Sequence, residues 1–264
     1  MAKARDDLRD IKGMFFDYGG VIEDLTPDHD KFSKGVGIIT GILEKEGIRI
    51  KEKELEEALI AGQEEYSNWI EKNNYVELPN ERIWTSFFLK KYCSDNRTTA
   101  LIEARSEELS SIFEYYLFRR RPSRELVKVI KTLFYLGYTL SLISNTMSRI
   151  LIPERLKKFG IERFFSATVL SMNVGFRKPR PEIFQEALKI TGLNPGQCIF
   201  IGDTLSRDIV GCRRAGFYRS VLLPSGITAI KDREYRGGAT PDYTIKSLNE
   251  LIPLLGGVAT TRRI

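Results

Sequence analysis

The sequence contains few of the residues on which many metal and nucleophilic centres depend. Its 264 residues include a single histidine, His29, and three widely separated cysteines, Cys93, Cys198 and Cys212. One histidine excludes a multi-histidine metal site. His29 lies in a charged stretch and is expected to be an exposed loop residue, so we expect no histidine-based catalytic triad. Three unclustered cysteines exclude a disulfide framework and a zinc knuckle, and they favour a reducing compartment.

Long apolar runs are also missing. No run approaches the roughly 18 residues of a membrane span. The first ten residues lack the apolar stretch of a secretory signal. The remaining composition, 42% hydrophobic and 29% charged, is that of a globular protein long enough for one or two domains. We therefore expect a cytoplasmic protein with no membrane partner.

Charge is distributed unevenly along the chain. Residues 28–118 hold 18 acidic and 12 basic side chains, a net charge of −6, whereas the remaining residues hold 17 acidic and 29 basic, a net charge of +12. This asymmetry indicates two bodies with different surfaces. Basic clusters such as residues 119–121 are more often solvated or ion-paired than ligand-binding. No zinc-finger or RNP-type motif accompanies them, so no nucleic-acid partner is expected.

Short apolar runs alternate with amphipathic stretches over most of the chain. The runs predict strands at residues 11–16, 138–143, 167–170, 198–201 and 219–223. The stretches between them predict helices at residues 123–136, 148–159, 181–190 and 205–215. Strands that alternate with helices indicate a parallel sheet covered on both faces, which is an α/β fold with a Rossmann-like three-layer core.

The segment between the first strand and the second has a different pattern. It shows no strand signal, and apolar residues recur at helical spacing in 51–72 and 98–118. Aromatic residues such as Tyr66 and Trp69 are expected in its core. This segment predicts an all-helical cap at residues 28–118, inserted into a core formed by residues 1–27 and 119–264. Residues 260–264 are expected to be a loose tail.

Polar residues follow three of the predicted strands at the point where each strand ends. In an open parallel sheet, ligands bind beyond the carboxyl ends of the strands. Asp17, Ser144 and Asp203 occupy such positions, and Asp208 and Lys178 lie in neighbouring loops. Carboxylates at this edge suit Mg²⁺, and a lysine and a hydroxyl nearby suit a phosphoryl group. A carboxylate can itself attack phosphorus and form an aspartyl-phosphate.

Four motifs in this order resemble those of the haloacid dehalogenase superfamily. They are DYGGV at residues 17–21, a strand that ends at Ser144, GFRKPRPEIF at residues 175–184, and GDTLSRD at residues 202–208. The resemblance implies that Asp17 is the nucleophile, and that Ser144 and the backbone amide of Asn145 hold the phosphate. It also implies that Lys178 pairs with Asp17 and the phosphate. The implied metal ligands are Asp17, the Gly19 carbonyl, Asp203 and Asp208, the last directly or through its neighbours.

One position departs from this resemblance. Phosphatases of the superfamily usually carry a second aspartate, the general acid and base, where this chain has Gly19. The carbonyl remains, but loss of a positioned general acid costs about 10²–10⁴ in rate. Either another group replaces it, or the leaving group needs no acid, or activity is weak. Nearby candidates for replacement are Glu23, Asp24, Asp28 and His29.

Three functions therefore compete. The first is a Mg²⁺-dependent phosphohydrolase that acts on a small phosphorylated metabolite. The second is a non-catalytic or weakly active binding protein on the same scaffold, for which Gly19 is the best argument. The third is a metal-independent 2-haloacid dehalogenase, which is disfavoured because Asp203 and Asp208 are retained. The sequence leaves the substrate and the oligomeric state open.

Overall fold

The apolar run that begins at Gly13 forms the central strand of a parallel sheet. In the computed structural model, which describes Leu8 and residues 10–255, β1 (Gly13–Phe16) is buried and pairs with β4 (Thr139–Ser144) and β6 (Cys198–Gly202). The strand order within the described residues is β5-β4-β1-β6-β7-β8. The outer strands are β5 (Phe165–Leu170), β7 (Arg219–Leu222) and β8 (Tyr243–Thr244). This arrangement confirms the predicted α/β, Rossmann-like fold.

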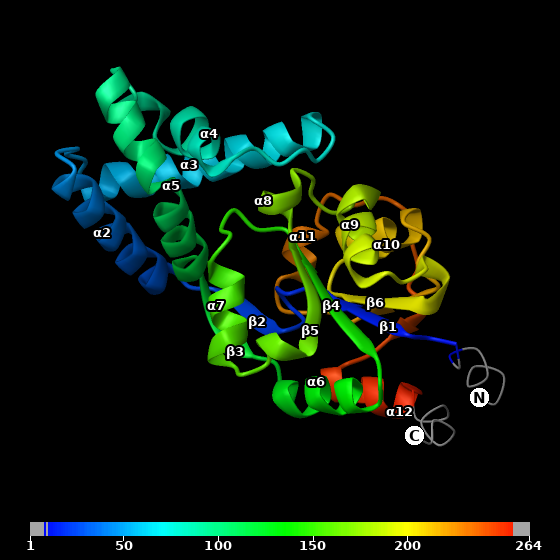
Figure 1. The fold of residues 1–264 in the computed structure, drawn as a ribbon. Coiled ribbons are helices and arrows are strands. Elements are labelled where there is room, and N and C mark those ends of the chain that lie inside the picture. Colours follow the sequence, from blue (N-terminus) through cyan, green and yellow to red (C-terminus); the bar gives the residue numbers. More distant parts are fainter. Residues whose placement is uncertain (1–7, 9, 256–264) are drawn as a thin grey trace.

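Helices cover both faces of this sheet, because successive side chains of a strand point to opposite faces. Met14 and Phe16 join the apolar cluster on one face, whereas Phe15 joins the cluster on the other. The first face is covered by α6 (Leu126–Tyr135), α7 (Leu151–Lys158) and α12 (Leu251–Leu255). The second is covered by α9 (Pro181–Thr191) and α10 (Val210–Arg214) (Figure 1).

Three of the predicted helices begin differently in the structure. The helices predicted from residues 123 and 148 begin at Leu126 and Leu151. Ser123 is instead tied to the chain after β1 through its backbone amide, and Ser148 accepts the Leu151 amide at its hydroxyl, 3.1 Å away. The helix predicted at 205–215 begins with a π-helical turn, η5 (Leu205–Ile209), before α10.

The segment between β1 and β4 contains the inserted helices. It has its own apolar cluster, in which Trp84, Phe88 and Phe113 are buried with their rings in contact. The helices predicted at residues 51–72 and 98–118 correspond to α3 (Glu52–Lys72) and α5 (Asn96–Tyr116), although α5 ends at Tyr116, just before the chain enters a strand. The elements are α2 (His29–Lys45), α3 (Glu52–Lys72), α4 (Asn80–Ile83), η1 (Trp84–Phe88), η2 (Lys90–Tyr92) and α5 (Asn96–Tyr116).

Two strands that the sequence pattern did not predict connect this segment to the sheet. β2 (Glu23–Pro27) and β3 (Phe118–Pro122) pair in antiparallel fashion. Glu23, the first residue of β2, is fully buried and accepts a hydrogen bond from Tyr18 Oη at 2.7 Å. It forms ion pairs with Arg120 of β3 and Arg155 of α7. The expectation that the arginine cluster is solvated or ion-paired is confirmed for Arg119, which pairs with Asp28, and for Arg120, whose ion pair with Glu23 is buried.

The remaining elements are short. Among the residues that the structure describes, no helix is long and apolar enough to cross a membrane. The tail expected at residues 260–264 lies outside the described residues. The short elements are α8 (Ser171–Val174), α11 (Thr228–Lys231), η3 (Glu162–Phe164), η4 (Pro195–Gln197) and η6 (Leu248–Glu250).

Candidate active site

Adjacent parallel strands bring the predicted site residues to one edge of the sheet. Asp17 follows β1, Ser144 ends β4, and Asp203 follows β6, which are neighbouring strands. The Asp17 amide donates to the Ile201 carbonyl at 2.8 Å, so Asp17 is held against β6. One carboxylate oxygen from each of Asp17, Asp203 and Asp208 lies within 4.8 Å of the other two. The structure therefore places together the carboxylates that the sequence singled out.

Lys178 lies between two of these carboxylates. Its Nζ is 2.6 Å from Asp17 Oδ1 and 2.7 Å from Asp208 Oδ1, and all three side chains are buried. Burial alone would lower the pKa of Lys178, but the attraction of the two carboxylates holds that pKa above its usual value. Lys178 is therefore a permanent positive charge beside Asp17.

The loop that carries Lys178 is held by the Asn145 side chain. Asn145 Oδ1 accepts the backbone amide of Lys178 at 2.8 Å, and Asn145 Nδ2 donates to the Lys178 carbonyl at 3.1 Å. These two hydrogen bonds join the loop after β4 to the loop between α8 and α9. The side chain of Asn145 thus positions Lys178, while the backbone amide of Asn145 stays the predicted phosphate contact. Ser144 is buried and lines the same cavity as Asp17.

Asp208 organises the turn after β6. Its Oδ2 accepts from the amides of Asp203 and Thr204, at 3.2 and 3.0 Å, and from Thr204 Oγ1 at 2.6 Å. Burial opposes the charge of Asp208, yet the Lys178 ammonium holds its pKa below the usual value. Both oxygens of Asp208 are therefore engaged within the protein, Oδ1 by Lys178 and Oδ2 by the turn.

Two glycines permit these close approaches. Gly20 has a φ of +98°, and a Cβ there would lie 2.2 Å from Asp203 Oδ2. A Cβ on Gly202 would lie 2.3 Å from the Cβ of Asp208. Any side chain at either position would therefore displace one of the acidic residues.

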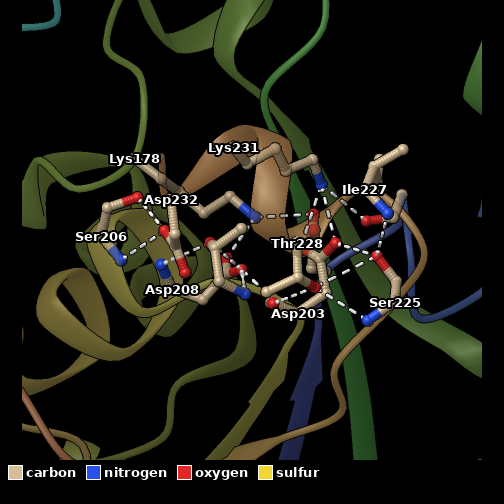
Figure 2. Close-up of polar contacts among 12 residues, drawn as sticks. Lys178, Asp203, Ser206, Asp208, Ser225, Ile227, Thr228, Lys231 and Asp232 are labelled. Carbon is tan, nitrogen blue, oxygen red and sulfur yellow. Dashed lines mark hydrogen bonds and ion pairs between the residues drawn. The ribbon is translucent and has the colours of Figure 1, made fainter. Parts of the chain in front are cut away.

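Asp203 has partners that the sequence reasoning did not identify. Ser225 Oγ donates to Asp203 Oδ2 at 2.7 Å, and Lys231 Nζ lies 2.9 and 3.0 Å from the two carboxylate oxygens (Figure 2). Burial raises the pKa of Asp203 to about 7, although Lys231 opposes the shift. Lys231 also donates to the Gly19 carbonyl at 3.0 Å. Neither Ser225 nor Lys231 belongs to any of the four motifs, so the sequence reasoning had no signal for them.

None of the four residues considered as a replacement for the missing acid lines the cavity beside Asp17 within the described chain. Glu23 is fully buried in the network between β2 and β3, and Asp24 is exposed. Asp28 caps α2 by accepting the Lys31 amide at 3.1 Å. The side chain of His29 is 79% exposed, as expected, and lies 3.2 Å from Glu56, but His29 is the first residue of α2 and not a loop residue. Gly19 therefore faces the cavity with no acid supplied from these positions.

Two glutamates of α5 hold the loop that follows Ser144. Glu114 accepts from Thr146 Oγ1 at 2.5 Å and from the Met147 amide at 2.8 Å. Glu107 accepts from Ser148 Oγ at 2.8 Å and from the Arg149 amide at 2.7 Å. Burial raises the pKa of Glu114. The inserted helices therefore contact the backbone of the predicted phosphate-binding loop directly.

A cavity of about 490 Å³ joins these parts, and its size suits a small metabolite. Asp17, Ser144 and Lys178 lie on its wall beside side chains of the inserted helices, including Gln63 and Phe113. Tyr66, expected in the core of the helices, is buried and also lines the cavity. The lining includes five cationic side chains, which would attract an anionic ligand, and three carboxylates. The cations are Arg120, Arg177, Lys178, Arg207 and Lys231, and the carboxylates are Asp17, Glu114 and Asp208.

Comparison with known proteins identifies the family of this chain. A family model described as haloacid dehalogenase-like hydrolase matches residues 11–216. The chain belongs to this hydrolase family. A solved structure of the family fold, the 2-haloacid dehalogenase from Pseudomonas syringae pv. Tomato DC3000, superposes with a TM-score of 0.65 at 18% identity. It covers 93% of this chain and 98% of that one, which shows a shared fold.

Other relatives of this haloacid dehalogenase-like hydrolase are named as phosphatases. The glyceraldehyde 3-phosphate phosphatase of Methanopyrus kandleri is 30% identical over 140 residues, which are 53% of this chain. The pyrophosphatase PpaX of Halalkalibacterium halodurans is 31% identical over 135 residues, which are 51% of this chain. The matches span 58% and 60% of the length of these relatives.

Proposed function

We propose that this protein is a Mg²⁺-dependent phosphohydrolase that acts on a small phosphorylated metabolite through an aspartyl-phosphate on Asp17. The observation that carries this proposal is the buried ion pair of Asp17 and Lys178, 2.6 Å apart, on the wall of a cation-lined cavity. The phosphatase names of the relatives support the same reaction class.

Each residue has a role in this proposal. Asp17 is the nucleophile, and Lys178 is its ionic partner and balances the charge of the phosphoryl oxygens. Ser144 Oγ and the Asn145 amide bind the phosphate. The inserted helices at residues 28–118 act as a cap over a core formed by residues 1–27 and 119–264. That role is supported by Gln63 and Phe113, which line the same cavity as Asp17.

The oxygen atoms near Asp17 form a donor set that suits Mg²⁺, which prefers oxygen ligands. Asp17, Asp203 and the Gly19 carbonyl would hold the ion, and Asp208 would position Asp203. That Gly19 and Asp203 already share one cationic partner, Lys231 Nζ, supports a cation position between them. When bound, Mg²⁺ supplies positive charge against the phosphoryl oxygens.

The reaction has two steps. In the first, an Asp17 oxygen bonds to phosphorus while the bond from phosphorus to the leaving oxygen breaks, and the leaving group takes a proton from water. In the second, water attacks the same phosphorus, the bond to Asp17 breaks, and inorganic phosphate leaves with the carboxylate restored. Lys178 stays protonated throughout, since it is paired on both sides.

Phosphate release from a panel of small esters tests this function. The panel includes glyceraldehyde 3-phosphate, inorganic pyrophosphate and p-nitrophenyl phosphate, each assayed with Mg²⁺ and with EDTA. We expect release with Mg²⁺ that EDTA abolishes. Absence of release from every compound would favour the non-catalytic alternative. Halide release from a 2-haloacid that persists in EDTA would favour the dehalogenase.

Gly19 supports a second, finer prediction. Because Gly19 has no acidic side chain, and none of the four candidate replacements lines the cavity, alkyl phosphates should react more slowly than p-nitrophenyl phosphate, whose leaving group departs without protonation. Gly19→Asp should raise the rate with alkyl phosphates by about 10- to 100-fold, since a general acid contributes about 10²–10⁴. A Cβ at this position would lie 3.0 Å from Leu25 Cδ1, which is a flexible side-chain end.

Gly19→Asn is the matched control, because it has the same shape without a titratable proton. It should leave the ratio between alkyl and aryl phosphates unchanged. Equal rates for the Asp and Asn variants with every ester would show that a missing general acid does not limit this enzyme.

A further inference from the structure

Lys231 lies at the point where two of the proposed metal ligands converge. Its Nζ is 3.0 Å from the Gly19 carbonyl and 2.9 and 3.0 Å from the two oxygens of Asp203. Figure 2 shows the side chain extending from α11 toward Asp203. A Mg²⁺ ion would lie about 2.0–2.1 Å from the same oxygens. The ammonium and the ion therefore cannot occupy this place together.

The backbone at Lys231 is held by hydrogen bonds of the residues on either side of it, Thr228 and Asp232. Thr228 Oγ1 donates to the Asp203 carbonyl at 2.7 Å, which joins the start of α11 to the strand end. Asp232 accepts the amides of Leu205 and Ser206 at 2.7 and 3.0 Å, which joins the end of α11 to the start of η5. These hydrogen bonds hold α11 where the Lys231 ammonium reaches the Asp203 carboxylate.

The charges of the site explain why a cation belongs there. Asp17, Asp203 and Asp208 lie within 4.8 Å of one another, and Lys178 pairs with only the first and the last. Asp203 is fully buried and takes its ionic partner from Lys231, whose side chain is 19% exposed. A third buried carboxylate without a cation would be strongly unfavourable.

We propose that the Lys231 ammonium is a built-in counter-ion that occupies the divalent-metal position, so that metal binding requires its withdrawal. This inference rests on the proposed function for the identity of the metal site. Lys231 also lines the cavity, so its flexible side chain can move there while α11 stays in place. Metal and lysine then exclude each other through both space and charge.

Binding of Mn²⁺ alone, without substrate, tests this competition. Free Mn²⁺ is measured by electron paramagnetic resonance during titration of wild type and of Lys231→Met, which removes the charge and keeps the length. We expect the variant to bind about tenfold more tightly or better, because no charge-assisted bonds must be broken first. Lys189→Met, at a surface pair with Glu186, should bind like wild type. Equal affinities for Lys231→Met and wild type, or no binding to either, would overturn the proposal.

A second measurement uses the unaltered protein and so does not depend on the folding of a variant. Lysines are acetylated briefly with acetic anhydride, with and without Mg²⁺, and each site is quantified by mass spectrometry. Withdrawal from Asp203 should make Lys231 several-fold more reactive with Mg²⁺, whereas the exposed Lys189 should not change. Unchanged reactivity of Lys231 at saturating Mg²⁺ would contradict withdrawal.

These measurements separate this inference from the proposed function. Neither depends on turnover, so a protein that hydrolyses no ester but binds Mn²⁺ more tightly after Lys231→Met would retain the inference and lose the phosphatase. A protein that hydrolyses esters with Mg²⁺, but whose metal affinity is unchanged by Lys231→Met and whose Lys231 acetylation is unchanged by Mg²⁺, would retain the phosphatase function and lose this inference.

Discussion

Replacement of Asp17 with asparagine is expected to lower kcat for Mg²⁺-dependent phosphate release by about 10⁴-fold or more. The amide oxygen is a far weaker nucleophile than the carboxylate, and an amide does not form the acyl-phosphate that water then hydrolyses. Asparagine has nearly the same shape, and its carbonyl can still accept from Lys178, which lies 2.6 Å from Asp17 Oδ1. Steady-state kinetics on the best ester of the panel provides the measurement.

The control for this variant is Asp24→Asn. Asp24 is an exposed carboxylate on β2 that does not line the cavity, so its neutralisation should leave kcat within about twofold. Circular dichroism should show that both variants fold like wild type. A kcat of Asp17→Asn within tenfold of wild type would rule out Asp17 as the nucleophile.

Replacement of Lys178 with methionine should destabilise the protein as well as inactivate it. The ammonium bridges Asp17 and Asp208, and its removal leaves buried carboxylates close together without their shared cation. Removal of one partner from a buried ion pair costs about 3–5 kcal/mol of unfolding free energy. Loss of a positioned charge at the reacting phosphoryl group costs about 10²–10³ in kcat. Urea denaturation and steady-state kinetics measure the two effects.

The stability loss should depend on pH in a defined direction. In wild type, Lys178 holds the pKa of Asp208 below its usual value, so Asp208 contributes stability above about pH 4, and that contribution is lost as pH falls through the folded-state pKa. In Lys178→Met, burial without the ammonium should raise that pKa, so protonation relieves the repulsion at mildly acidic pH. The difference from wild type should be largest near pH 7 and shrink toward pH 4.

A surface lysine provides the comparison for this second variant. The side chain of Lys189 is 79% exposed and pairs with Glu186 along α9, and its replacement by methionine should change the unfolding free energy by less than about 0.5 kcal/mol at either pH. A loss for Lys178→Met that does not vary with pH would mean that packing, and not charge, accounts for the effect.

The parallel sheet could be predicted from the sequence because its strands are short apolar runs with polar residues directly after them. Asp17, Ser144 and Asp203 lie at strand ends, and the order of strands then brings them to one edge. Lys178 lies on a loop, and the motif around it placed it at the site. The motif did not predict that the Asn145 side chain would hold the backbone of Lys178 through two hydrogen bonds.

The ribbon of β2 and β3 could not be predicted because charged residues build it. A run of arginines beside a proline has no alternating apolar pattern, and such a run indicates a solvated surface. The pairing becomes visible only when Glu23 and Arg120, 97 positions apart, are seen to share a buried contact. Local pattern carries no information about such long-range pairs.

Lys231 and Glu114 were missed for related reasons. Lys231 lies beyond the last motif, and its partners are a backbone carbonyl and a residue 28 positions earlier. Glu114 has the appearance of an ordinary polar position on an amphipathic helix, yet it is half-buried and accepts hydrogen bonds from the loop after β4. In both cases the tertiary contact determines the function of a residue type that is usually solvated.

The contacts of Glu107 and Glu114 have a consequence for the catalytic cycle. Because α5 accepts the amides of residues 147 to 149, a rotation of the helices about β2 and β3 would pull on the loop that follows Ser144, while Ser144 itself stays paired within the sheet. The proposed phosphate contacts of Ser144 and the Asn145 amide would then change as the helices move. In the proposed reaction, release of inorganic phosphate would thus be coupled to movement of the helices.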